Sequence, residues 1–125
     1  MKVLVTGAAG FIGYHLCKKC IENNFPIIGI DNLNNYYDRN LKINRLEKLK
    51  SFSASKKKEF NFKKIDLQDK DSIEEIFKQN EITHVVNLAA QAGVRYSLEN
   101  PHAYIESNIM GFLNILELSR TFNVK

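Results

Sequence analysis

The sequence predicts an α/β fold built on a parallel sheet. Short apolar, β-branched runs alternate with segments of helical spacing, no repeat or linker divides them, and a glycine-rich turn joins the first run to the first helix. This alternation is typical of βαβ units, whose right-handed crossovers place helices on the faces of the sheet. We therefore expect residues 1–125 to form one part of a domain, with about four strands in the order 3-2-1-4.

The predicted strands are the runs richest in apolar and β-branched residues. The first, KVLVT, ends at Gly7, and the second, IIGID, follows Pro26. Such runs, bounded by glycine, proline or asparagine, are typical of strands buried in a parallel sheet. In chain order, the predicted strands cover residues 2–6, 27–31, 60–66 and 83–89.

The predicted helices carry apolar residues at intervals of three and four. In chain order, they cover residues 11–23, 39–50, 72–79 and 101–122, and the last opens with Pro101. We expect Asp71 or Ser72 to cap the third, with Glu74 and Glu75 near its positive end. An Asn-rich loop, 32–38, precedes the second helix, and a Ser-rich connector, 51–58, follows it.

Apolar stripes on the first two predicted helices indicate the faces that pack on the sheet. The stripe residues are Ile12, Leu16, Cys17, Cys20 and Ile21 in the first helix, and Leu41, Ile43, Leu46 and Leu49 in the second. Because Cys17 and Cys20 lie inside such a stripe and no His has a supporting spacing, we expect them to pack in the core and not to bind a metal.

The composition argues against nucleic-acid and membrane partners. Lys and Arg number 18 against 14 Asp and Glu, a net charge of +4. The densest cationic run, 56–58, lies in a Ser-rich stretch without an aromatic stacking pattern, so we expect solvated loop charge. No apolar run approaches the roughly 18 to 20 residues of a membrane-spanning helix, and no signal peptide is evident, so we expect a cytoplasmic protein.

Residues 6–13, TGAAGFIG, form a glycine-rich turn from strand to helix. Gly7 can take the tight turn, Gly10 allows a pyrophosphate to approach the backbone, and Gly13 allows close packing of helix against strand. The pyrophosphate would accept hydrogen bonds from free N–H groups at the positive end of the helix. The turn therefore predicts a dinucleotide-binding Rossmann fold, with a turn used only for packing as the alternative.

Polar and small residues at the strand ends fit the same ligand. Asp31 can accept hydrogen bonds from the adenosine ribose, and its charge would repel a 2′-phosphate, which favours NAD over NADP. Asp66 could bind the adenine amino group, and the small residues 88–90 let backbone lie along the cofactor. Asn108, a poor helix former in mid-helix, predicts a polar contact towards the cofactor. The alternatives are a plain strand-end acid for Asp66 and ordinary core packing for 88–90.

The glycine turn, Asp31-Asn32 and the NLAA segment at 87–90 resemble the extended short-chain dehydrogenase/reductase family. Within it, DNLNNYYD at 31–38 and AAQAGVRYS at 89–97 resemble the UDP-glucuronate 4-epimerases, which supply UDP-galacturonate for bacterial surface polysaccharides. The similarity covers nearly all of the chain. It implies that residues 1–125 are the N-terminal part of the NAD-binding Rossmann domain of an NAD-dependent epimerase/dehydratase.

The resemblance implies tightly held NAD. Together with Gly13 and Leu88 from the patterns above, the expected cofactor-binding residues are Gly7, Gly10, Phe11, Ile12, Asp31, Asn32, Asn35, Asp66, Leu67, Ala89, Ala90, Gln91 and Asn108. It also implies that the loop 91–96 borders the sugar site. Arg95 is the cation we expect near an anionic sugar nucleotide, and a surface ion pair with Glu99 is the alternative.

The implied chemistry moves hydride from sugar C4 to the nicotinamide and returns it to the other face of a 4-keto intermediate. In the family, a Tyr, a Lys four residues on and a Ser or Thr supply the acid–base groups. Those groups would lie beyond Lys125, so we expect no catalytic residue in this chain and no activity alone. Tyr14 and Lys18 have the Tyr–Lys spacing, but they lie on the first helix and lack the Ser- or Thr-bearing strand.

Three interpretations remain open. In the first, the chain is the cofactor half of such an epimerase and binds a UDP-sugar only if the C-terminal half is supplied. In the second, it is a non-catalytic NAD-binding or oligomerisation module. In the third, it is part of another nucleotide-sugar epimerase or dehydratase. The predicted helix 101–122, which joins a dimer-forming bundle in the family, and the bare edge of the fourth strand both favour a homo-oligomer.

Overall fold

The computed structural model describes all residues from Met1 to Lys125. Its centre is a parallel sheet of four strands in the order β3-β2-β1-β4, which confirms the predicted order. The strands are β1 (Val3–Thr6), β2 (Ile27–Asp31), β3 (Phe60–Lys64) and β4 (His84–Asn87). In the register of the sheet, Val5 lies between Gly29 of β2 and Val86 of β4.

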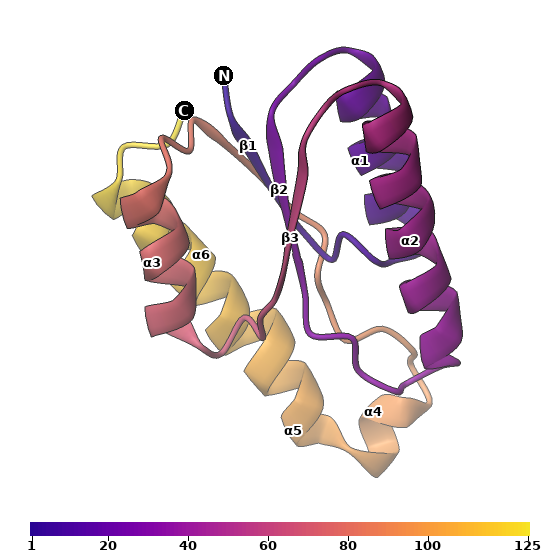
Figure 1. Ribbon diagram of the computed structural model, residues 1–125. Coiled ribbons are helices and arrows are strands. Elements are labelled where there is room, and N and C mark those ends of the chain that lie inside the picture. Colours follow the sequence, from indigo (N-terminus) through magenta and orange to yellow (C-terminus); the bar gives the residue numbers. More distant parts are fainter.

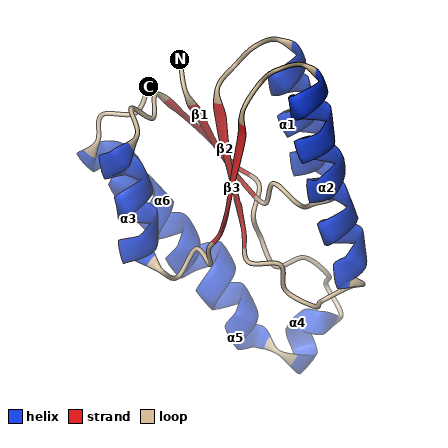
Figure 2. Ribbon diagram, in the orientation of Figure 1, coloured by secondary structure: helices blue, strands red, loops and turns tan.

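Helices cover both faces of the sheet (Figure 1; Figure 2). One face carries α1 (Phe11–Glu22) and α2 (Arg39–Ser55), and the other carries α3 (Lys70–Gln79) and α6 (Phe112–Thr121). Between β4 and α6 the chain forms α4 (Tyr96–Glu99), α5 (Pro101–Tyr104) and a π-helical segment, η1 (Ile105–Gly111). This three-layer arrangement is the Rossmann-like fold that the alternating pattern predicts.

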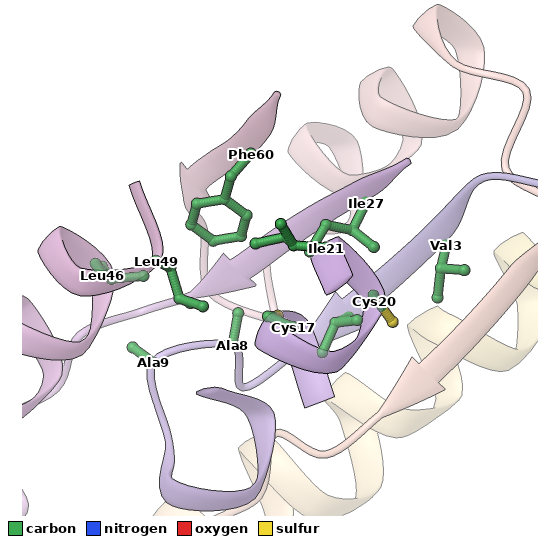
Figure 3. Packing of buried hydrophobic residues seen from close by; sticks show 11 residues of the cluster. Val3, Ala8, Ala9, Cys17, Cys20, Ile21, Ile27, Leu46, Leu49 and Phe60 are labelled. Atoms are coloured by element: carbon green, nitrogen blue, oxygen red, sulfur yellow. The ribbon is translucent and has the colours of Figure 1, made fainter. Parts of the chain in front are cut away.

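Two apolar clusters hold the layers together, one on each face of the sheet. Figure 3 shows the first, in which Val3 and Ile27 of the strands meet Cys17 and Ile21 of α1 and Leu49 of α2. On the opposite face, a second cluster joins the sheet to α3 and α6; its members include Leu4, Ile28, Ile30, Ile73, Phe77, Ile115 and Leu118. Successive residues of a strand pack in opposite clusters because their side chains point alternately to the two faces of the sheet. Each fully buried side chain of this size contributes about 1.5–3 kcal/mol relative to an exposed one.

The two cysteines are free and buried, which confirms core packing. Burial, with the adjacent Cys20, raises the pKa of Cys17 to about 12, and burial also raises the pKa of Cys20. Both thiols therefore stay protonated at neutral pH. No group of three or more His, Cys, Asp or Glu side chains is arranged to hold a metal ion. None of the helices has the length and apolar character needed to cross a membrane.

The second helix is longer than its sequence pattern predicts. It continues to Ser55, so most of the expected connector 51–58 is helical. The hydroxyls of Ser53 and Ser55 donate to carbonyls three residues back, and Ser53 is buried. These local bonds, together with packing, overcome the modest helix preference of serine.

The third helix begins earlier than expected. Its cap is Asp69, not Asp71 or Ser72, because the Asp69 carboxylate accepts from the Ser72 amide at 3.0 Å and from its hydroxyl at 2.6 Å. This bonding holds the pKa of Asp69 below its usual value. Glu74 and Glu75 pair with Lys78 instead of serving the positive end of the helix.

The long helix expected over 101–122 is present, because the chain is helical without a break from Pro101 to Thr121, but its middle part, η1, is π-helical. The short helix α4, which the sequence did not predict, precedes it. At the end of η1, a Cβ on Gly111 would lie 2.6 Å from the Leu67 Cβ, so this turn packs tightly on the loop after β3.

The predicted apolar stripes of α1 and α2 also need correction, because Ile12 is 65% exposed and Leu41 and Ile43 are exposed.

Candidate functional site

A cavity of about 550 Å³ opens at the carboxyl ends of the strands. Ligands of open parallel α/β sheets bind at this edge, and the volume falls within the range of small-molecule and cofactor sites. The predicted cofactor residues that line the cavity are Gly7, Gly10, Phe11, Asp31, Asn32, Asp66, Leu67, Leu88, Ala89, Ala90 and Gln91. The structure therefore brings together residues from the ends of all four strands. Ile12, Gly13, Asn35, Asn108 and Arg95 do not line it.

The glycine turn forms one wall of the cavity. Gly7 has φ +69°, and a Cβ there would lie 2.8 Å from the Ala89 amide nitrogen, so only glycine fits. Gly10 donates its N–H to the Gly7 carbonyl at 2.9 Å and begins α1 without any capping side chain. The N–H groups of the first turn are therefore left free, as a phosphate site requires.

Thr6 ties this turn to the end of β4. Its hydroxyl accepts from the amides of Leu88 and Ala89, each at 3.0 Å, and donates to the Asn87 side chain. The residues after β4 are thereby held beside Gly7. Thr6 begins the glycine motif, so its position was visible in the sequence, but its partners were not.

Asp31 lies at the centre of a small polar cluster. Its carboxylate is almost fully buried and accepts from the Ala9 amide at 3.2 Å and from the Leu33 amide at 2.8 Å. The Lys42 ammonium lies 3.9 Å from one carboxylate oxygen. These contacts hold the carboxylate at the cavity wall with accepting capacity to spare, since an ionised carboxylate has about four lone-pair sites.

Asp66 and Asn32 form the neighbouring part of the wall. The Asn32 amide donates to Asp66 at 2.9 Å, and the other Asp66 oxygen accepts from the Gln68 amide at 3.0 Å. Asp66 therefore lies two residues beyond the end of β3, where it is hydrogen-bonded and lines the cavity.

Asn108 holds the loop after β4. Its amide accepts from the Gln91 N–H at 2.8 Å and donates to the Gln91 carbonyl at 3.0 Å. The polar contact that mid-helix asparagine predicts is therefore made to Gln91, which itself lines the cavity. Arg95 is exposed at the start of α4 and makes no ion pair with Glu99.

Sequence reasoning missed the contribution of α2 to the cavity. Lys42 and Arg45 line it, as do Asn34, Tyr36 and Tyr37 of the Asn-rich loop. One signal for Lys42 was present, because it lies four and seven residues before Leu46 and Leu49. A lysine on the core-facing stripe of a helix marks a buried cation.

The family comparison covers almost the entire chain. A family model described as GDP-mannose 4,6 dehydratase matches residues 4–125. The chain belongs to this family. The match agrees with the expected membership of the NAD-dependent epimerases and dehydratases.

Two curated relatives of this dehydratase-family chain are about half identical to it. Protein CapI of Staphylococcus aureus is 50% identical over 125 residues, which are 100% of this chain and 36% of CapI. A UDP-glucuronate 4-epimerase of Thermodesulfobacterium geofontis is 46% identical over 122 residues, which are 98% of this chain and 36% of that protein. The chain thus spans little more than a third of the length of these relatives.

A solved structure shares the fold. UDP-glucuronic acid 4-epimerase from Bacillus cereus, a variant in complex with NAD and UDP-4-deoxy-4-fluoro-glucuronic acid, matches with a TM-score of 0.85 and 32% identity. The match covers 100% of this family member and 38% of the epimerase chain.

Proposed function

We propose that the chain binds NAD and forms the cofactor-binding part of a nucleotide-sugar 4-epimerase that interconverts UDP-glucuronate and UDP-galacturonate. One observation carries the proposal: a glycine turn with free amides and a buried carboxylate, Asp31, line a single cavity at the carboxyl edge of the sheet. The relatives named UDP-glucuronate 4-epimerase support the sugar assignment.

The cavity wall matches the parts of a dinucleotide in order. The free amides at the start of α1 suit the pyrophosphate, because they donate hydrogen bonds at the positive end of a helix. Asp31 suits the adenosine ribose as an acceptor, and Asp66 and Asn32 suit the adenine edge. When bound, NAD supplies the hydride acceptor for oxidation at sugar C4.

The 125 residues supply no acid–base pair for the sugar hydroxyl in this proposal. The one Tyr–Lys pair with family spacing, Tyr14 and Lys18, does not line the cavity. The Lys18 ammonium lies 5.4 Å from the centre of the Phe52 ring instead. We therefore expect the chain alone to bind NAD and not to epimerise the sugar.

Calorimetric titration of the purified chain with NAD, with NADP as the control ligand, tests the first part. We expect NAD to bind and NADP to bind more weakly. Incubation with NAD and UDP-glucuronate, followed by chromatography of the nucleotide sugars, tests the second, and we expect no UDP-galacturonate. Absence of NAD binding would refute the proposed function, and product formation by the chain alone would refute the missing acid–base pair.

A second candidate function is self-association. Ile105, Ile109, Leu113 and Leu116 are exposed on η1 and α6, and β4 forms an edge of the sheet. Such apolar surface favours an interface. Sedimentation velocity should then show a dimer or larger species at micromolar concentration, and a monomer across the whole concentration range would contradict it.

A further inference from the structure

The wall of the cavity beside Asp31 contains a buried lysine whose hydrogen-bonding capacity is mostly unused. The Lys42 side chain is 7% exposed and lines the cavity. Its ammonium donates to the Asn34 side-chain oxygen at 2.7 Å. The nearest Asp31 oxygen, at 3.9 Å, is close enough for ionic attraction but too far for a hydrogen bond. One of three N–H donors is therefore used within the protein.

The groups around the Lys42 ammonium offer no further hydrogen-bond acceptor within the protein, so an acceptor for its unused N–H donors would lie in the cavity. The Tyr37 ring lies 4.9 Å from the ammonium, and Arg45, the next cation on α2, donates to the Ala9 carbonyl and the Tyr37 hydroxyl, each at 3.1 Å. Burial lowers the pKa of Lys42, while Asp31 raises it. Buried polar groups in native proteins almost always find partners, so the two unused donors point to a ligand atom.

We propose that Lys42 determines specificity for the adenosine ribose, donating to one of the two vicinal hydroxyls from which Asp31 accepts. This inference rests on the proposed function, because it assigns a second contact at the same cofactor site. A hydroxyl is both donor and acceptor, and the Lys42–Asp31 pair offers one group of each kind on one wall. A 2′-phosphate would lose its hydroxyl donor to Asp31.

A cycle of protein and ligand variants tests the contact. Wild type, Lys42→Met and Lys42→Arg are titrated calorimetrically with NAD and with NAD lacking the 2′- or the 3′-hydroxyl of the adenosine ribose. We expect Lys42→Met to weaken NAD binding at least tenfold, about 1.4 kcal/mol. It should change the affinity for one of the two deoxy forms by less than about twofold, because that form has already lost the contact. Lys42→Arg should restore part of the affinity for NAD. Lys48→Met, an exposed lysine on the same helix, is the matched control and should bind all three ligands like wild type.

Each outcome has one meaning. Equal losses for NAD and for both deoxy forms would show that Lys42 only supports the loop through Asn34, and would overturn the inference while the proposed function stands. No binding of NAD by wild type would overturn the proposed function and the inference together. If thermal unfolding shows that Lys42→Met does not fold, Lys42→Arg takes its place in the cycle. A loss of affinity for NAD that disappears with one deoxy form supports the inference, and equal losses for all three ligands overturn it.

Discussion

Gly13→Ala is expected to abolish NAD binding and to destabilise the protein. A Cβ at this position would collide with the Gly7 carbonyl oxygen and would lie 2.8 Å from the Gly7 carbonyl carbon and 3.0 Å from the Ala8 Cα. All three are backbone atoms of the glycine turn, so relief requires the turn itself to open. Overpacking of this kind costs about 1–3 kcal/mol. Because opening the turn would displace the free amides at the start of α1, we expect NAD affinity to fall at least 100-fold. Chemical denaturation and calorimetric titration measure the two effects.

Gly10→Ala is the informative companion. Its Cβ would meet a single atom, the Gly7 carbonyl oxygen, at 3.1 Å, so the loss of stability should be smaller than for Gly13→Ala. Gly10 lines the cavity, and the added methyl would keep a pyrophosphate away from the turn. We therefore expect weakened NAD binding with stability near wild type. Wild-type NAD affinity in both variants would show that the turn is used only for packing.

Asp31→Ala should weaken NAD binding more than tenfold, about 1.4 kcal/mol, and should also lower the free energy of unfolding. The carboxylate is the acceptor for the Ala9 and Leu33 amides and the ion-pair partner of Lys42. Its removal leaves buried donors without a partner, at a cost of about 1–3 kcal/mol for each unsatisfied group. We therefore expect both the NAD affinity, measured by titration, and the free energy of unfolding, measured by urea denaturation, to fall in this variant.

Two further variants separate charge from hydrogen bonding at this position. Asp31→Asn keeps one accepting oxygen and removes the charge, so it should retain more stability than Asp31→Ala. Asp71→Ala removes one negative charge from an exposed position at the start of α3 and should leave NAD affinity unchanged. Equal NAD affinity in wild type and Asp31→Ala would refute the role of Asp31 at the ribose.

Local patterns were enough to predict much of the site, because neighbouring residues encode them. The glycine spacing, the apolar runs and the acids that end two predicted strands predicted the sheet order and seven of the 21 residues that line the cavity, and the family resemblance added four more. Parallel strands bring their carboxyl ends to one edge, so residues that follow different strands meet without any further information.

The contacts that hold the wall in place depend on the tertiary structure. The Thr6 hydroxyl accepts hydrogen bonds from the amides of Leu88 and Ala89, which lie more than eighty residues later in the chain. The Asn108 side chain bonds to Gln91, which lies seventeen residues earlier. The π-helical segment before α6 ends where Gly111 packs on Leu67. The helix propensities of the neighbouring residues do not predict this contact.

By itself, the sequence determined the fold class, the strand order, the glycine turn and the acid at the end of β2, because each follows from residue types at fixed short spacings. The burial of Lys42 beside Asp31 and the bonds from Asn108 to the loop after β4 follow instead from the packing of the folded chain. The partners of a side chain depend on how separate elements pack against one another. The residue spacing within one segment does not predict its contacts with a distant segment.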